Sequence, residues 1–379
     1  MKDLALYIHI PFCERKCYYC DFTSFSGKDD QVSKYTDYLI KEISLYKEKI
    51  SQEFSIKSIF IGGGTPSSIH EDYIKKILKY VYGNYPANNI EEITIEVNPG
   101  SLTLKKARKY KEMGINRISI GLQSLDNRLL KSIGRIHNSD DFYESYKILK
   151  DLGFKNISVD LMFGLPDQSL QDFHKTLEKI VLLDLTHISL YSLILEEGTL
   201  FYKWEEENKI KLPSEEEDRE MYHSAVRFLN ENGYKHYEIS NFAKEDSKCV
   251  QNMAYWSVEP YLGIGINSHS NLDHKRFSNV SDFETYYKRL DMDRFPIHSS
   301  EHIPKEMEIA EYIILGLRLI QGIDKNKFKN RFNLDINHIY KEQILKNIKD
   351  GLLVQNENHI KLTSYGLDLA NRVELDFFP

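Results

Sequence analysis

The sequence has few cysteines and no long hydrophobic run. Only four of its 379 residues are cysteine, and three of these lie close together. This favours a metal or redox site in a reducing compartment over a disulfide framework. No apolar stretch approaches the roughly 20 residues of a membrane-spanning helix, and the start MKDLALYIHI lacks the basic segment and apolar core of a secretory signal. We therefore expect a cytoplasmic protein without a transmembrane segment.

The chain also lacks an excess of positive charge. Its 50 Lys and Arg residues are outnumbered by 57 Asp and Glu residues, which gives a formal net charge of -7. Proteins that bind the phosphate backbone normally present a dominant basic surface, so we expect no nucleic-acid partner. The acidic run at 215–220 follows Ser214 and is typical of a helix N-terminus.

Short β-type runs alternate with amphipathic segments along the N-terminal half. The expected strands are 4–10, 58–64, 93–99, 115–121, 156–162 and 187–193. Strands joined by single crossover helices are parallel, so we expect an α/β fold with a partial (β/α)6 barrel. Near His302 the pattern changes to helix, helix, hairpin and helix. We expect two domains: a barrel with a following β/α extension at 1–300, and a small winged-helix-like domain at 301–379.

Three cysteines, Cys13, Cys17 and Cys20, form a C-x3-C-x2-C pattern directly after the first expected strand. Structural zinc sites usually close with four ligands, and the remaining thiol, Cys249, is far along the chain. A cubane iron-sulfur cluster held by only three thiolates keeps one iron open for another ligand. We interpret the three cysteines as ligands of a [4Fe-4S] cluster. A zinc-stabilised regulatory or interaction protein is the alternative.

This cysteine pattern resembles the cluster loop of the radical S-adenosylmethionine (SAM) enzymes. The resemblance implies that SAM binds the open iron and that the reduced cluster cleaves it to methionine and a 5'-deoxyadenosyl radical. The stretch IGGGTPS follows the second expected strand, and its glycines let the backbone approach a ligand closely. The resemblance assigns SAM contacts to eight residues: Tyr7, Gly63, Gly64, Thr65, Glu96, Gln123, Arg135 and Asp160.

Further motifs narrow the resemblance to the oxygen-independent coproporphyrinogen III oxidase-like proteins, over most of the chain. They are YIHIPFC, GGGTP, GLQS, DLMFGLP and QNMAYWSVEPYLGIGINSHS. The true oxidases carry a further cysteine two places after the third cluster ligand, where this chain has Phe22, and an extension ahead of the first strand. Both departures favour the heme-chaperone branch, HemW.

The HemW branch implies a protein that binds heme and transfers it to acceptor proteins, with transient contact with membrane hemoproteins. The alternative is the oxidase reaction, the radical oxidative decarboxylation of coproporphyrinogen III to protoporphyrinogen IX. Whether the chain is an enzyme stays open at this point.

One position departs from the chaperone branch, which typically reads HNxxYW. This chain reads QNMAYW, with Gln251 at the His position. A glutamine amide is a poor iron ligand beside imidazole. The remaining candidates for the heme iron are His9, His269 and Cys249, and Tyr255 and Trp256 either stack on the macrocycle or pack in the core.

Overall fold

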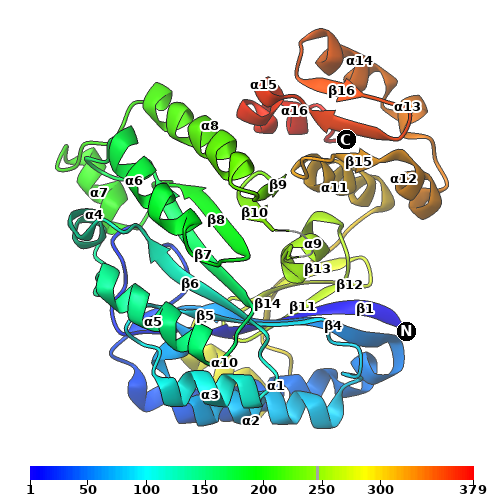
Figure 1. Cartoon of the computed structure of the whole chain (residues 1–379). Coiled ribbons are helices and arrows are strands. Elements are labelled where there is room, and N and C mark those ends of the chain that lie inside the picture. The colour runs from blue at the N-terminus through cyan, green and yellow to red at the C-terminus, as the bar shows by residue number, and fades with distance from the viewer. Residues whose placement is uncertain (245–246) are drawn as a thin grey trace.

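The chain folds around one long sheet with helices on its outer face, as Figure 1 shows. The structure is a computed structural model and describes residues 1–244 and 247–379. In sheet order the twelve strands are β14 (Ile297–His302), β13 (Lys275–Asn279), β12 (His269–Leu272), β11 (Tyr261–Ile264), β1 (Lys2–Ile10), β4 (Phe54–Gly63), β5 (Glu92–Val97), β6 (Arg117–Gln123), β7 (Asn156–Phe163), β8 (His187–Ser192), β10 (Asn241–Ala243) and β9 (Lys235–Glu238).

The run from β1 to β8 is the barrel part of this sheet. Its six strands pair in parallel, each with the next in chain order. They coincide with the six expected strands, so the α/β fold with a partial (β/α)6 barrel is confirmed. In parallel strands the carboxyl ends meet at one edge, and the side chains that alternate toward the concave face can meet there.

Helices connect these strands and cover the sheet. The connecting helices are α1 (Val32–Glu53), α2 (Glu71–Asn84), α3 (Leu104–Glu112), α4 (Asn127–Ser132), α5 (Ser139–Asp151) and α6 (Leu170–Val181). Two further helices, α7 (Leu200–Glu206) and α8 (Glu215–Glu231), follow β8. In α6, Phe173, Leu177 and Ile180 recur at helical spacing and are buried against the sheet. In α8 the Ser214 hydroxyl accepts the Glu217 N–H, as the acidic run predicted.

Beyond β1 the sheet continues into an extension. Strand β11 pairs with β1 in parallel, and β12, β13 and β14 follow as antiparallel neighbours. Two helices belong to this part, α9 (Val250–Trp256) and α10 (Phe283–Asp291). Gly263 of β11 lies where a Cβ atom would collide with the backbone carbonyl of His269, so the close approach of β11 and β12 requires glycine.

The C-terminal segment, orange to red in Figure 1, has its own hydrophobic cluster. Its elements are α11 (Lys305–Leu317), β15 (Ile323–Asp324), α12 (Lys325–Phe332), α13 (Ile336–Ile339), α14 (Lys341–Lys349), β16 (Leu353–Gln355), β17 (His359–Leu362), α15 (Ser364–Asp368) and α16 (Ala370–Leu375). The expected order of helices and hairpin is present, and the domain limits of 1–300 and 301–379 stay a prediction. None of the helices in the described residues is long and apolar enough to cross a membrane.

Candidate functional site

The three clustered cysteines lie on a loop at the carboxyl end of β1. Two short strands, β2 (Phe12–Cys13) and β3 (Phe25–Ser26), pair across the base of this loop. All three thiols are free and partly buried. Burial raises the pKa of the Cys20 thiol to about 11. In the described residues no three His, Cys, Asp or Glu side chains form a ready-made metal site, so the loop offers three separate thiols.

The glycine-rich turn after β4 lies directly against the cysteine loop. Gly63 has a φ of +114°, which favours glycine. A Cβ atom on Gly64 would lie 3.0 Å from the Cys13 sulfur and 2.7 Å from the backbone carbonyl of Phe12. The Thr65 hydroxyl is 3.5 Å from the same sulfur. The absence of side chains at these glycines therefore leaves room beside Cys13.

Arg135 links the cysteine loop to the ends of β5 and β6. Its guanidinium lies 3.5 Å from the Cys17 sulfur and 2.7 Å from the Asn98 side-chain oxygen, and it also donates to the Gly121 carbonyl. Asn98 in turn donates to the Thr65 hydroxyl at 3.0 Å. The buried Nε of Arg135 has no partner within the described residues. A partly buried guanidinium with a donor to spare fits an anionic ligand.

Asn98 was missed by the sequence analysis. It lies two residues after Glu96 in the EVNP stretch, at the carboxyl end of β5. Its polar side chain directly after a buried strand was the available signal, because side chains at that edge of a barrel face the site.

Two partly buried carboxyl groups, Glu96 and Asp160, occupy the concave face of the barrel. The Gly63 N–H donates to Glu96 at 3.0 Å, and Ser119 donates to Asp160 at 3.3 Å. Burial, reinforced by the charge of Asp160, raises the pKa of Glu96 to about 7. Burial also raises the pKa of Asp160. These two carboxyl groups are therefore better placed to accept hydrogen bonds from the neutral hydroxyls of a ligand than to bind an anionic group.

The other two predicted SAM contacts lie on the same face. Gln123 ends β6 with a φ of 69°, and its amide nitrogen lies beside Gly121, close to Arg135. The Tyr7 hydroxyl is 2.9 Å from Nδ1 of His9. The barrel thus brings all eight predicted residues to its concave face or its carboxyl edge, although their role in binding SAM stays a prediction.

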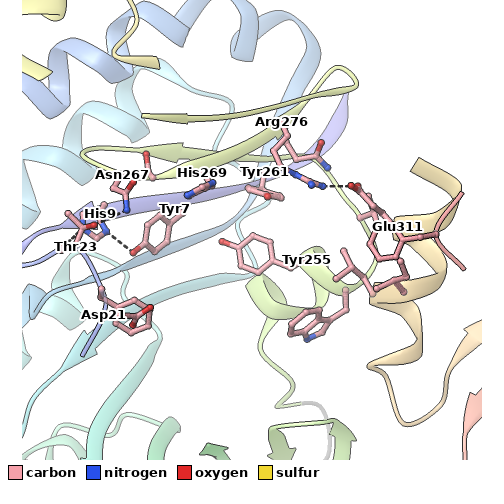
Figure 2. Close-up of a pocket in the computed structure, with 18 residues that line it drawn as sticks. Tyr7, His9, Asp21, Thr23, Tyr255, Tyr261, Asn267, His269, Arg276 and Glu311 are labelled. Atoms are coloured by element: carbon pink, nitrogen blue, oxygen red, sulfur yellow. Dashed lines mark hydrogen bonds and ion pairs between the residues drawn. The ribbon is translucent and has the colours of Figure 1, made fainter. Parts of the chain in front are cut away.

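A large cavity of about 760 Å³ opens between the barrel, the sheet extension and the C-terminal segment (Figure 2). The residues that line it are Tyr7, His9, Asp21, Phe22, Thr23, Tyr255, Trp256, Val258, Tyr261, Asn267, Ser268, His269, Asn271, Arg276, Glu311, Ile314, Leu315 and Phe378. Three of them, Asp21, Phe22 and Thr23, follow Cys20 directly, so the cavity adjoins the cysteine loop. Phe22, which stands where the oxidases have a further cysteine, is 64% exposed.

Of the sequence motif QNMAYW, only the aromatic end reaches this cavity. Tyr255 and Trp256 line it, whereas Gln251 is 1% exposed and lies behind them. The Gln251 amide accepts from Ser58 at 2.7 Å and donates to the Tyr255 hydroxyl at 2.8 Å. Gln251 therefore supports Tyr255 from within the protein and does not face the cavity.

Comparison with known proteins identifies the family. Residues 7–180 match the Radical SAM superfamily, and residues 303–369 match the HemN C-terminal domain. The chain is 36% identical over 371 residues to "Heme chaperone HemW" of Bacillus subtilis (strain 168), covering 97% of each chain. The chain belongs to the HemW family. Its relatives also include "Heme chaperone HemW" of Escherichia coli (strain K12), which is 31% identical and covers 99% of this chain and 98% of its own length.

A solved structure shows the fold of this chain. "Coproporphyrinogen III oxidase (HemN) from Escherichia coli is a Radical SAM enzyme" superposes with a TM-score of 0.87, covering 99% of this chain and 90% of the other, at 23% identity. This chain therefore has the HemN fold. Membership of the radical SAM superfamily implies SAM and a [4Fe-4S] cluster as cofactors.

The cysteine loop fits such a cluster in its chemistry. It offers three free thiols, the donor type that iron-sulfur clusters require. Gly64 lies next to the Cys13 thiol, and the guanidinium of Arg135, whose Nε has no partner in the part of the chain that the structure describes, lies next to the Cys17 thiol.

Proposed function

We propose that this protein binds heme and transfers it to an acceptor protein, and that its barrel binds a [4Fe-4S] cluster and SAM. The observation that carries the proposal is the match to heme chaperones over nearly the whole chain. The large cavity supports it, because its volume suits a ligand of macrocycle size and aromatic side chains contribute to its lining.

In this proposal the cysteine loop holds the cluster through Cys13, Cys17 and Cys20. When bound and reduced, the cluster supplies the electron for cleavage of SAM. The residues that bind SAM are Tyr7, Gly63, Gly64, Thr65, Glu96, Gln123, Arg135 and Asp160, together with Asn98. Among them, Arg135 pairs with the carboxylate of SAM, and Glu96 and Asp160 accept from its hydroxyls.

The same proposal predicts where the protein is located and which partners it has. We place the protein in the cytoplasm, where its free thiols stay reduced. Its partners would be heme or a related porphyrin and a heme-acceptor protein, with transient contact with membrane hemoproteins. The C-terminal domain, from residue 301 onward, would close the cavity opposite the barrel through α11.

One observation favours a second function, that of a coproporphyrinogen III oxidase. The large cavity adjoins the cysteine loop through Asp21, Phe22 and Thr23, so a bound tetrapyrrole would lie near the site proposed for SAM. Proximity of that kind is what radical abstraction from a propionate side chain requires.

One anaerobic experiment distinguishes the two functions, and it uses the reconstituted protein with SAM and a reductant. One arm contains hemin and the other coproporphyrinogen III. We expect stoichiometric hemin binding, followed by transfer to a heme-free acceptor protein, and no protoporphyrinogen. Absence of hemin binding together with protoporphyrinogen formation and matching 5'-deoxyadenosine would replace the proposal with the oxidase function.

A further inference from the structure

We propose that His269 is the protein ligand of the heme iron, and that Arg276 binds a heme propionate from the same face of the sheet extension. The inference rests on the proposed heme binding and assigns the residues that perform it. It is carried by the free imidazole nitrogens in the large cavity and by the register of β12 and β13.

The side chains of the large cavity offer two imidazoles, and only one has free nitrogens. Nδ1 of His9 lies 2.9 Å from the Tyr7 hydroxyl, and its Nε2 lies 2.8 Å from the Thr23 carbonyl. Both nitrogens of His9 are therefore occupied, and the residue is buried. The His269 imidazole, in contrast, is exposed, lines the cavity and has no hydrogen-bond partner among the described residues. An iron ligand needs a nitrogen lone pair that no other group uses.

Cys249 does not compete for this role. It is buried at 1% exposure, and its thiol donates to Glu92 at 3.4 Å. Burial raises the pKa of this thiol to about 12, which opposes the thiolate form that binds iron. Cys249 also does not line the cavity.

The hairpin of β12 and β13 places His269 and Arg276 on one face. His269 pairs with Ser278, and Asn271 pairs with Arg276. Because side chains two residues apart on a strand share a face, His269, Asn271 and Arg276 point the same way. All three line the cavity, and Figure 2 shows His269 and Arg276 along the same wall.

The Arg276 guanidinium already faces two carboxylates, and the more distant one, that of Glu301 on β14, lies 3.9 Å away. The guanidinium donates to Glu311 of α11 at 2.7 Å across the cavity edge. A guanidinium carries five N–H donors, and of these two carboxylates only Glu311 is within hydrogen-bond distance, so donors remain for a propionate.

The test is a hemin titration of the full-length protein, followed in the Soret region. The variants are His269→Gln and Arg276→Gln, and His298→Gln on the neighbouring strand β14 is the matched control, because His298 is exposed and outside the cavity. A parallel titration uses protoporphyrin IX, which has no iron. Thermal melting and cluster content of each variant report on folding.

We expect His269→Gln to weaken hemin binding by about tenfold or more and to shift the Soret band. Its affinity for protoporphyrin IX should change by less than about twofold, and added imidazole should restore the Soret position. Arg276→Gln should weaken both titrations and leave the Soret band of bound hemin in place. His298→Gln should match the parent chain.

Two results would overturn the inference while heme binding itself stands. One is an unchanged hemin affinity and spectrum in His269→Gln. The other is an equal loss for hemin and for protoporphyrin IX in that variant, which would mean that His269 packs against the macrocycle without binding iron. If the parent chain fails to bind hemin at all, the proposed function fails first.

Discussion

The cysteine end of the barrel and the large cavity are built in different ways. At the cysteine end, Thr65, Asn98 and Arg135 are joined by short hydrogen bonds and follow successive strands. The cavity is assembled from the N-terminal loop, the sheet extension, α11 and Phe378, which lie far apart in the chain. The cysteine end can therefore be recognised from local sequence motifs, whereas the large cavity depends on how distant segments pack together.

The largest contrast between the two regions should come from Cys17→Ala. Two remaining thiolates cannot hold a cubane, so iron and sulfide content after anaerobic reconstitution should fall to background. Hemin affinity should stay within about twofold of the parent, because Cys17 does not line the cavity. Cys249→Ser is the control and should keep its cluster. Normal iron and sulfide content in Cys17→Ala would show that these thiols are not the ligands.

Arg135→Ala should weaken SAM binding at the cysteine end of the barrel, a smaller effect than the loss of the cluster in Cys17→Ala. It removes a buried donor next to Cys17 and Asn98, and loss of a hydrogen bond to a charged ligand costs about 1.5–3 kcal/mol. Calorimetry should therefore show SAM affinity lower by about 10- to 100-fold. Arg128→Ala, at an exposed position of α4, should leave the affinity unchanged. Equal SAM affinity in the two variants would remove Arg135 from the site.

On the cavity side, the buried carboxyl group of Glu42 should make the stability of the protein depend on pH. Its carboxyl is 0% exposed and accepts from Gly265 at 2.8 Å, Asn279 at 2.6 Å and Tyr286 at 2.6 Å, which anchors the turn just before His269. Burial raises its pKa from 4.5 to about 7.

Because the folded state holds the Glu42 proton more tightly, this group stabilises the fold fully below pH 4.5 and loses that contribution as pH rises through about 7. Glu42→Gln cannot ionise. The free energy of unfolding of the parent minus that of the variant should fall by roughly 1–3 kcal/mol across this window. A difference that does not vary with pH would show that Glu42 keeps one charge state.

The contrast between the regions also explains what could be read from the sequence. The parallel strands were predicted from local periodicity and are confirmed, and the role of the three cysteines as cluster ligands, predicted from their spacing, stays a prediction. The glycine turn and Arg135 came from the resemblance to a known family. The orientation of Gln251 and the free nitrogens of His269 could not be predicted, because they depend on the packing of α9 and the register of β12 against β13.

The smallest effect on heme binding should come from Gln251→His, which creates the HNxxYW pattern. Position 251 lies behind Tyr255 and outside the cavity, so an imidazole there has no path to the iron. Hemin affinity should stay within about twofold of the parent. Stability should fall by about 1–3 kcal/mol, because the bonds to Ser58 and Tyr255 are disturbed. Tighter hemin binding with a shifted Soret band would mean that α9 turns toward the cavity when heme binds, and that the two regions are less separate than their contacts indicate.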